Sequence, residues 1–408
     1  MKLMTRKGLG GLAALTALTM IAAACGSSSK SSSSSNNATP TTASSSATPT
    51  TPAPSGAKFM TPAQVEASWD LYTTTPPGVQ LPSAIPPDFS GSVKLTPVPK
   101  ADVNGDGKVV IAIATVGDSH DQGFYQSFID KAKAFVARYK SQGWSLIVVD
   151  RVNPADAAQQ VKNLCTQGAD LVALGDSQLA DAIPAFSSPE CSKTAAYVEG
   201  VVPQQPNFAQ SQDSIPGVLY SAGVAAGLLL KQQNSTKAGF ITGPELDFSK
   251  QAAKYFEVGV KSQVPNATVV ETFTGDFDDS AKGQEAARAQ ISQGVKVMYP
   301  YLGGATNAAV KQANSAGVLT LTPGNYRCND TQYKFAVSVI FDPGYYMLPF
   351  LQKFANGQYE LGQMAKYFTG RTPDPTVIMC SPTAAQKQVL AQTISDIGAG
   401  KIDPTKAG

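Results

Sequence analysis

Residues 108–135 read KVVIAIATVGDSHDQGFYQSFIDKAKAF, and this stretch decides the fold. Its first part, 108–116, is a continuous apolar run rich in β-branched residues, which is typical of a strand buried on both faces of a parallel sheet. Gly117 breaks the run. Apolar residues then recur at three- and four-residue spacing, so residues 122–139 are expected to form an amphipathic helix. The order strand, polar loop, helix predicts an α/β unit.

The loop of this unit is rich in side chains that can hydrogen-bond. It carries Asp118, Ser119, His120 and Asp121, and Phe124 follows in the first helical turn. In open α/β sheets, ligands bind beyond the carboxyl ends of the strands, which makes these residues candidate ligand contacts. The alternative is that the polar side chains only cap the helix, as Asp121 is placed to do. With Gln122 the loop has five polar residues, which exceed what one cap requires and so favour the ligand site.

From residue 108 onward, strands and helices alternate. Further strands are expected at 145–150, 170–174, 194–198, 237–242, 268–274, 295–299, 318–322 and 335–341. The alternation restarts after an apolar helix at 215–231, which predicts an α/β fold with two doubly wound parallel-sheet lobes joined by a hinge. We expect lobe 1 at 105–214, lobe 2 at 215–340, and a C-terminal segment, 341–408, that returns across the hinge.

Polar and aromatic side chains also follow the other predicted strands. The further candidate ligand contacts are Asp176, Ser177 and Glu199 in lobe 1, and Glu245, Asp247, Phe248, Gly303, Gly304, Thr306, Asn325 and Tyr326 in lobe 2. Acidic residues outnumber basic ones among them, which disfavours an anionic ligand. Aromatic rings offer flat surfaces for stacking. The pattern therefore predicts a small, partly aromatic, uncharged or weakly charged solute held between the lobes.

The N-terminus has the features of an export signal. Basic residues are followed by the apolar run 9–21 and by three alanines, which end residues 1–24 as a cleavable segment. Cys25 comes next and resembles the lipid-modified cysteine of a bacterial lipobox; the alternative is an ordinary signal with an incidental Cys. Residues 25–58 form a Ser/Thr/Pro-rich tether. We therefore expect an exported protein, lipid-anchored to the outer face of a bacterial cell membrane.

Residues 59–104 form a Pro-rich N-terminal extension, in which Thr61-Pro62-Ala63 has the pattern of a helix start. Beyond the export signal, no apolar run approaches the roughly 20 residues that a membrane-spanning helix needs.

Charge and cysteine content exclude several classes of site. Without the basic residues of the export signal, Lys2, Arg6 and Lys7, the chain has 29 basic and 30 acidic residues. No basic patch with interleaved aromatics is present, so no nucleic-acid partner is expected. His120 is the only His and no CxxC spacing occurs, so we expect neither a metal site nor a cofactor.

Four cysteines remain after Cys25, and an even number in an exported chain suggests disulfides. Four cysteines allow three pairings. Cys165 and Cys191 flank one predicted strand of lobe 1, whereas Cys328 and Cys380 lie in late loops. We therefore predict the disulfides Cys165–Cys191 and Cys328–Cys380.

Several short motifs, in this order and spacing, resemble the basic membrane protein family, the purine-nucleoside receptors of bacterial ABC importers. They are 121–126 (DQGFYQ), 220–226 (YSAGVAA), 238–243 (AGFITG), Phe256-x-x-Gly259, 264–267 (VPNA), 277–279 (FDD) with Lys282-Gly283, and Gly303-Gly304. The resemblance implies a type I periplasmic-binding-protein fold, with three hinge crossings and the ligand between two lobes. It also implies ABC permease and ATPase subunits as partners. Asp121, Phe124, Gly303 and Gly304 align with the family's ligand site.

The chain departs from the family pattern at two positions. The ribose-binding Asp expected after strand 318–322 is replaced by Pro323-Gly324-Asn325, and the Lys near the final crossing corresponds to about Phe341. A site whose polar groups hydrogen-bond a sugar strongly rejects ligands that lack the matching hydroxyls, so these two replacements bear on which ligand is bound. The resemblance therefore predicts a solute-binding and transport role, with a nucleoside or sugar-like ligand as one candidate.

Two other classes of function remain as alternatives. An enzyme is disfavoured, because the chain lacks GxGxxG after the first strand, GxxxxGK[ST] and GxSxG. His120 is the one candidate general base, and a lone His in a polar loop is more often a hydrogen-bonding group. A ligand-sensing or adhesion surface lipoprotein not coupled to transport is the second alternative. We expect a monomeric binding protein rather than an enzyme.

Overall fold

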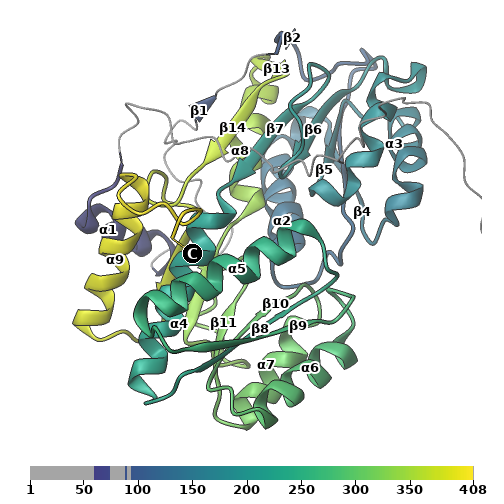
Figure 1. Ribbon diagram of the computed structural model, residues 1–408. Coiled ribbons are helices and arrows are strands. Elements are labelled where there is room, and N and C mark those ends of the chain that lie inside the picture. The colour runs from purple at the N-terminus through teal and green to yellow at the C-terminus, as the bar shows by residue number, and fades with distance from the viewer. Residues whose placement is uncertain (1–58, 74–87, 90–92, 408) are drawn as a thin grey trace, which may run out of the picture. The chain divides into compact units, whose positions relative to one another are not determined.

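A computed structural model of the chain describes residues 59–73, 88–89 and 93–407. The expected export signal, Cys25 and the tether all lie outside the described residues. In the part that is described, no helix is long and apolar enough to cross a membrane. Two large sheets organise this part, each covered by helices (Figure 1).

The first sheet builds lobe 1. Its strands, in hydrogen-bonded order, are β1 (Asp88–Phe89), β14 (Met364–Tyr367), β7 (Ala209–Asp213), β6 (Ala195–Glu199), β5 (Leu171–Leu174), β3 (Val109–Ala114) and β4 (Trp144–Val149). All neighbours are parallel except β1 and β14. A small antiparallel pair, β2 (Thr96–Val98) with β13 (Tyr359–Leu361), accompanies it.

The central strand β3 has apolar residues at every position, without the alternation of apolar and polar residues found in a half-exposed strand. Ile111 and Ile113 pack under α2 (Phe124–Ala137) and α8 (Pro343–Ala355). Ala112 and Ala114 face the opposite layer, made by α3 (Ala157–Thr166) and the 3-10 segment η3 (Ser177–Ser187). Both faces of β3 are therefore buried, as its unbroken apolar run predicts.

The second sheet builds lobe 2. Its strands, in order, are β15 (Thr376–Met379), β12 (Val337–Ile340), β11 (Leu319–Thr322), β10 (Val297–Tyr301), β8 (Lys237–Thr242) and β9 (Thr268–Phe273). Only β15 is antiparallel to its neighbour. Helices α4 (Ile215–Gln232) and α5 (Asp247–Gln263) pack on one face, and α6 (Ser280–Ser292) and α7 (Thr306–Ser315) on the other. The predicted fold of two doubly wound parallel-sheet lobes is confirmed.

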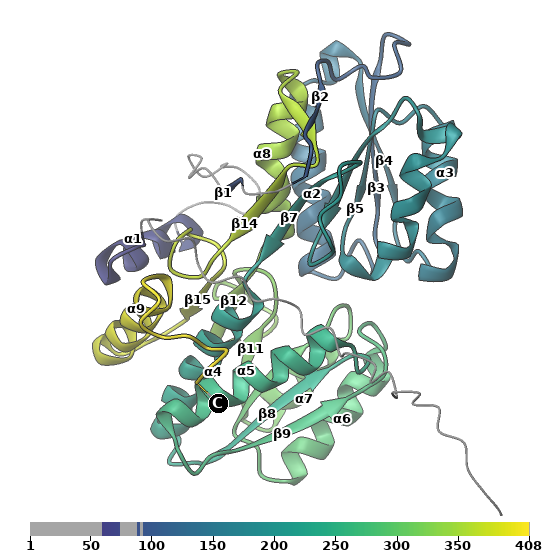
Figure 2. The same cartoon turned by 45° about the horizontal axis from the view of Figure 1, so that its top comes forward.

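Within residues 93–407, the chain passes between the sheets three times. The first crossing, at Ser214, joins β7 to α4, and the second, Phe341 and Asp342, joins β12 to α8. The third crossing, residues 368–375, joins β14 in the first sheet to β15 in the second. Helix α1 (Pro62–Thr73) lies beside α9 (Ala384–Gly398), as Figures 1 and 2 both show, and packs into the lobe 2 core with it.

Two glycines allow α4 and α5 to pack closely. A Cβ added at Gly223 would lie 2.1 Å from the carbonyl oxygen of Phe256, and one at Gly259 would lie 2.1 Å from that of Tyr220. No side chain fits at these separations. The small residues of the apolar segment 215–231 thus serve helix–helix contact.

The predicted disulfides are both present. Cys165–Cys191 joins the end of α3 to the short 3-10 turn η4 (Pro189–Cys191) within lobe 1. Cys328–Cys380 joins the loop after β11 to the residue after β15 within lobe 2. The Cα atoms of each pair are 5.0 Å apart.

Strands β13, β14 and β15 of the C-terminal segment were not anticipated. The segment after Asp176 is a 3-10 helix, and Pro184 inside it lacks the backbone donor that an α-helix would use. Strand β7, AQSQD, was not anticipated, because its polar side chains give no strand signal. Gln210 in this strand is fully buried, and its amide donates to the carbonyls of Gly200 and Val202 at 2.9 Å each.

Candidate functional site

Asp121 begins the loop–helix junction that follows β3. Its carboxylate accepts hydrogen bonds from the backbone N–H groups of Gly123 (2.8 Å), Gln126 (3.0 Å) and Tyr125 (3.1 Å). Burial outweighs these three bonds and raises its pKa. Asp121 therefore acts as a cap that fixes the start of α2, the role that was the alternative to direct ligand contact.

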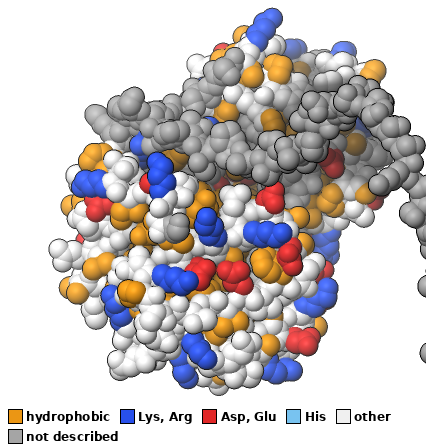
Figure 3. Space-filling view, viewed as in Figure 1, with side chains coloured by type: hydrophobic (Ala, Val, Ile, Leu, Met, Phe, Trp, Pro, Cys, Tyr) orange, Lys and Arg blue, Asp and Glu red, His pale blue; other side chains and the backbone are white. Residues whose placement is uncertain are grey.

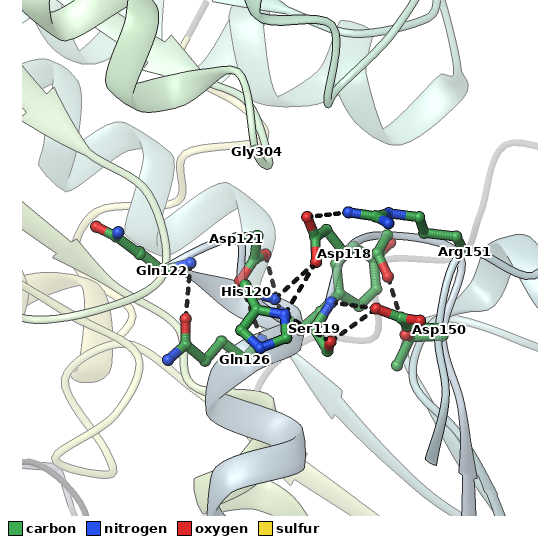
Figure 4. A network of polar contacts seen from close by, with 12 residues as sticks. Asp118, Ser119, His120, Asp121, Gln122, Gln126, Asp150, Arg151 and Gly304 are labelled. Atoms are coloured by element: carbon green, nitrogen blue, oxygen red, sulfur yellow. Dashed lines mark hydrogen bonds and ion pairs between the residues drawn. The ribbon is translucent and has the colours of Figure 1, made fainter.

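The rest of the loop forms a polar network with the end of β4 (Figure 4). Asp118 pairs with Arg151, and Asp150 accepts from the backbone N–H (2.9 Å) and hydroxyl (2.7 Å) of Ser119. Burial opposes ionisation of Asp118, but hydrogen bonds from His120 and Arg151 outweigh it and lower its pKa. The His120 ring is 83% exposed, with Nδ1 3.4 Å from an Asp118 oxygen. Asp118, His120 and Asp150 could share a cation geometrically, yet their oxygens already have these protein partners.

Tyr125 links this loop to the end of β5. Its hydroxyl donates a short hydrogen bond to the buried Asp176, which also accepts from the backbone N–H of Gln178. Burial raises the pKa of the Asp176 carboxyl. Ser177 follows as the first residue of η3. Asp176 is thus fixed by protein groups on both sides.

Glu199, at the end of β6, is enclosed. It is 2% exposed and accepts hydrogen bonds from the hydroxyls of Tyr197 (2.7 Å) and Ser211. Burial raises the pKa of Glu199 well above its usual range. In this arrangement its carboxyl stabilises the sheet interior instead of presenting a surface to solute.

In lobe 2, Asp278 organises the loops after β9 and β10. It accepts a hydrogen bond from the backbone N–H of Gly304 at 2.5 Å, and a Cβ added at Gly303 would lie 2.5 Å from the same oxygen. Burial raises the pKa of Asp278, and the charge of Asp118 in lobe 1 adds to this. The Gly304 loop faces the Asp118 loop in Figure 4. The two glycines therefore allow close approach to a carboxylate that neighbours lobe 1.

The remaining lobe 2 candidates are spread more widely. Thr306, the first residue of α7, is buried and donates to the carbonyl of Leu302 in the preceding loop at 2.8 Å. Phe248 stacks on Phe277 with ring centroids 6.0 Å apart. Glu245 pairs with Lys250 at 3.6 Å, and Asp247 is exposed in the first turn of α5. These residues are not joined by direct contacts to the Asp118 loop.

Direct contacts join the two lobes at Gln122. Its side-chain oxygen accepts hydrogen bonds from Arg327 (3.1 Å) and Asn307 (3.2 Å) of lobe 2, and its φ is +55°. The Asn325 amide donates to the carbonyl of Gly123 at 2.9 Å. Arg327 is held by Asp330 and lies over the Phe335 ring, 4.5 Å from its centroid. We name this set, Gln122, Gly123, Asn307, Asn325 and Arg327, the inter-lobe contact.

An aromatic row lies beside the inter-lobe contact. The ring centroids of Phe124 and Phe341 are 6.2 Å apart, and those of Phe341 and Tyr301 are 5.9 Å apart. Phe124 comes from α2 of lobe 1, yet it packs against the hydrophobic core of lobe 2. The ring centroid of Tyr326, the residue after Asn325, lies 6.5 Å from the ring centroid of Tyr72 in α1. Phe341 is buried in the lobe 2 core, so it links the half-buried rings of Phe124 and Tyr301.

The structure brings together Asp118, Ser119, His120, Asp121 and Phe124, and places Gly303, Gly304, Asn325 and Tyr326 across from them. Arg151 was not among the predicted contacts, although the strand-end rule points to it because it follows the predicted strand 145–150. Arg327, Asn307 and Tyr301 carried no such signal. Their importance appears only when the loops are assembled.

Comparison with known proteins decides the family. The model of the Bmp family, described as PnrA-like ABC transporter substrate-binding proteins, matches residues 108–368. The chain belongs to the Bmp family. It is 26% identical over 241 residues to the ABC transporter nucleoside-binding protein BmpA of Lactococcus lactis subsp. cremoris (strain MG1363), covering 55% of this chain and 68% of that protein.

Solved structures support the fold of this Bmp-family protein. An ABC transporter solute-binding protein from Conexibacter woesei superposes with a TM-score of 0.54 at 20% identity, covering 72% of this chain and 98% of that one. Another from Aeropyrum pernix K1 gives a TM-score of 0.61 at 15% identity, covering 72% and 92%. This Bmp-family protein is therefore a solute-binding component of an ABC importer, a class that works outside the cytoplasm.

Proposed function

We propose that this protein captures one small solute between its lobes, at the loops that follow β3 and β4 in lobe 1 and β10 and β11 in lobe 2. The observation that carries the proposal is the inter-lobe contact, in which Gln122 and Gly123 of lobe 1 meet Asn307, Asn325 and Arg327 of lobe 2. Strand-end loops that meet in this way can enclose a solute and hold the lobes together around it. Bound solute would then pass to the permease, with no chemical change.

The site chemistry supports a neutral, flat solute. Arg151 and Arg327, which lie at these loops, are paired with Asp118 and Asp330, and this disfavours an anionic ligand. Phe124 and Tyr301, which are half-buried, supply ring faces for stacking, worth on the order of 1 kcal/mol each beyond burial. The relative from L. lactis is described as nucleoside-binding. We therefore infer a nucleoside or a similar ring-bearing solute as the ligand.

A nucleoside panel tests this proposal. Adenosine, guanosine, ribose and tryptophan are added to the purified protein, and thermal unfolding is followed. A ligand at 100 times its dissociation constant stabilises the folded state by about 2.7 kcal/mol. We expect a nucleoside to raise the unfolding temperature and to elute unchanged from the denatured complex, as binding without catalysis requires. If none of these four solutes stabilises the protein, the proposed ligand class is wrong.

Phe124→Ala is expected to weaken nucleoside binding at least tenfold, or about 1.4 kcal/mol, in a calorimetric titration. The reason is that Phe124 spans from α2 to the lobe 2 aromatic row. Phe124 is preferable to Asp121 for this test, because Asp121→Ala also removes the cap of α2. Tyr139→Ala is the matched control, since it truncates a ring that stacks on Trp144 at the other end of α2. Equal binding by the two variants would place the ligand elsewhere.

The proposed anchor is a lipid on Cys25, supported by the small residues before it and the polar tether after it. Cys25→Ala is expected to release the protein into the medium or leave it unprocessed, whereas wild type incorporates radiolabelled palmitate. The matched control is Ser27→Ala in the tether, which should stay anchored. Normal processing and membrane retention of the Cys25 variant would contradict the anchor.

A further inference from the structure

Helix α1 is an addition to the part of the chain that the family model matches. It precedes residues 108–368, and two residues that it contacts, Asp374 and Thr376, follow them, as does Gly370, which contacts Met60 just before α1. Figure 2 shows α1 beside α9, next to the strand β15 that the third crossing leads into. A segment from before the matched region thus contacts a segment from after it, at the crossing between the lobes.

Contacts of α1 and of Met60 before it reach Gly370 and Asp374 in the third crossing, and Thr376, the first residue of β15. The backbone N–H of Met60, which precedes α1, donates to the carbonyl of Gly370 at 2.8 Å, and the Trp69 indole N–H donates to the Thr376 hydroxyl at 3.1 Å. Val65 and Trp69 are buried in the lobe 2 core, so α1 moves with lobe 2. The segment from Met60 to Trp69, which is fixed to lobe 2, therefore contacts the crossing at Gly370 and the residue that follows it, Thr376.

Tyr72 contacts the middle of the same crossing. Its hydroxyl donates to Asp374 at 3.0 Å, on the carboxylate oxygen Oδ2. The other oxygen accepts from the Tyr346 hydroxyl (2.6 Å) and from the backbone N–H of Asp342 (3.2 Å) in the second crossing. Asp342 is in turn bound by Lys131 of α2. The Asp374 carboxylate thus joins α1, two crossings and α8 of lobe 1.

The ring of Tyr72 reaches the solute site. Its centroid lies 6.5 Å from that of Tyr326, which stands between Asn325 and Arg327 of the inter-lobe contact. One side chain therefore touches both the crossing, through its hydroxyl, and a loop that meets lobe 1, through its ring.

We propose that Tyr72 is a positioning residue for the solute site, and that α1 acts through it as a brace on the third crossing. The brace limits how far the crossing bends and keeps the loop after β11 in register with lobe 1. This inference rests on the proposed solute-binding function. Its consequence is that α1 slows solute release, although α1 makes no part of the inter-lobe contact itself.

The experiment measures lobe separation and release separately. Spin labels at Lys140→Cys (lobe 1) and Lys311→Cys (lobe 2), both exposed positions, report the inter-lobe distance distribution of the solute-free protein by pulsed electron resonance. Stopped-flow displacement gives the dissociation rate of adenosine. Both are compared in wild type, Tyr72→Phe and Tyr72→Ala. Glu66→Ala is the matched control on the same helix, since it removes the 3.1 Å ion pair with Lys387 and leaves the crossing untouched.

Tyr72→Phe is expected to broaden the distance distribution and raise the adenosine dissociation rate roughly fivefold, the effect of one lost hydrogen bond. Tyr72→Ala should exceed it, because the ring contact with Tyr326 is lost too. Glu66→Ala should change neither quantity. If both Tyr72 variants keep the wild-type distribution, the brace is refuted, even where their unfolding temperature falls. If wild type does not bind adenosine, that ligand fails, and the distance distributions alone decide the role of Tyr72.

Discussion

Between pH 8 and pH 5 the free energy of unfolding is expected to rise, and Asp374→Asn is expected to remove roughly 3 kcal/mol of that rise. Asp374 is fully buried, and burial, with the neighbouring Asp342 charge, raises its pKa from 3.8 to about 7. Below pH 7 the folded state therefore holds a proton that the unfolded state releases until the pH falls to about 4. Above pH 7 the folded state bears the whole free-energy cost of the ionised, buried Asp374 carboxylate. Below pH 7 that cost falls by about 1.4 kcal/mol per pH unit.

Urea unfolding at each pH measures this effect. Of the titratable groups packed against Asp374, one is a carboxylate, Asp342. The others are the tyrosines Tyr72, Tyr345, Tyr346 and Tyr367.

Burial also raises the pKa values of Asp213 and Glu199. These two groups therefore also make the free energy of unfolding rise as the pH falls, and they do so in the Asp374→Asn variant as well. Asp130→Asn on the exposed side of α2 is the matched carboxylate-to-amide control. Parallel stability curves for wild type and Asp374→Asn would show that Asp374 does not titrate in this window.

Replacing Cys328 and Cys380 by Ser is expected to lower the free energy of unfolding by about 4 kcal/mol. The two residues are 52 positions apart, and closing a loop of that length restricts the unfolded chain by about this amount. The same bond holds the loop that follows β11, where Arg327 and Asn325 meet lobe 1. We therefore expect the double variant to lose affinity for nucleoside as well as stability.

The second disulfide provides the control. Cys165 and Cys191 are 26 positions apart, so their replacement by Ser should cost only slightly less stability, about 3.5 kcal/mol. That bond ties α3 to η4, away from the inter-lobe contact. Chemical denaturation should thus show similar losses, whereas calorimetry should show weaker binding only for the Cys328/Cys380 variant. Equal affinities in both variants would mean that the loop keeps its position without its disulfide.

The fold was predictable where burial leaves a mark on sequence. The apolar run that became β3 and the glycine that ends it predicted a strand buried on both faces, and the repeated alternation predicted two lobes. Strand β7 was missed because its buried Gln210 is stabilised by hydrogen bonds to Gly200 and Val202, which no local pattern reveals. Helix α1 was predicted from Thr61 and Pro62, but its contact with the third crossing was not.

The location of the site in the fold was predictable, but the contacts of its side chains were not. The strand-end rule located the loop from Asp118 to Asp121, but a sequence does not show which group each carboxylate binds. The Asp121 carboxylate accepts a hydrogen bond from the backbone at the start of α2, and the Asp176 carboxylate accepts one from the Tyr125 hydroxyl. Both carboxylates therefore fix the geometry of their loops. The inter-lobe contact depends on Gln122 and Arg327, more than 200 positions apart in the sequence, and such pairs become visible only in three dimensions.

The three crossings make each lobe discontinuous along the chain. The first sheet takes its strand β14 from beyond the whole second lobe, where residues 364–367 pair with 210–213. Neither lobe can be excised as one uninterrupted piece, because a cut after β7 removes β14, α8 and the small strand β13. During synthesis, lobe 1 must leave one edge of β7 open until nearly all of lobe 2 has been made. Late pairing between such distant residues slows folding, so a growing chain presents an unpaired strand edge for much of its synthesis.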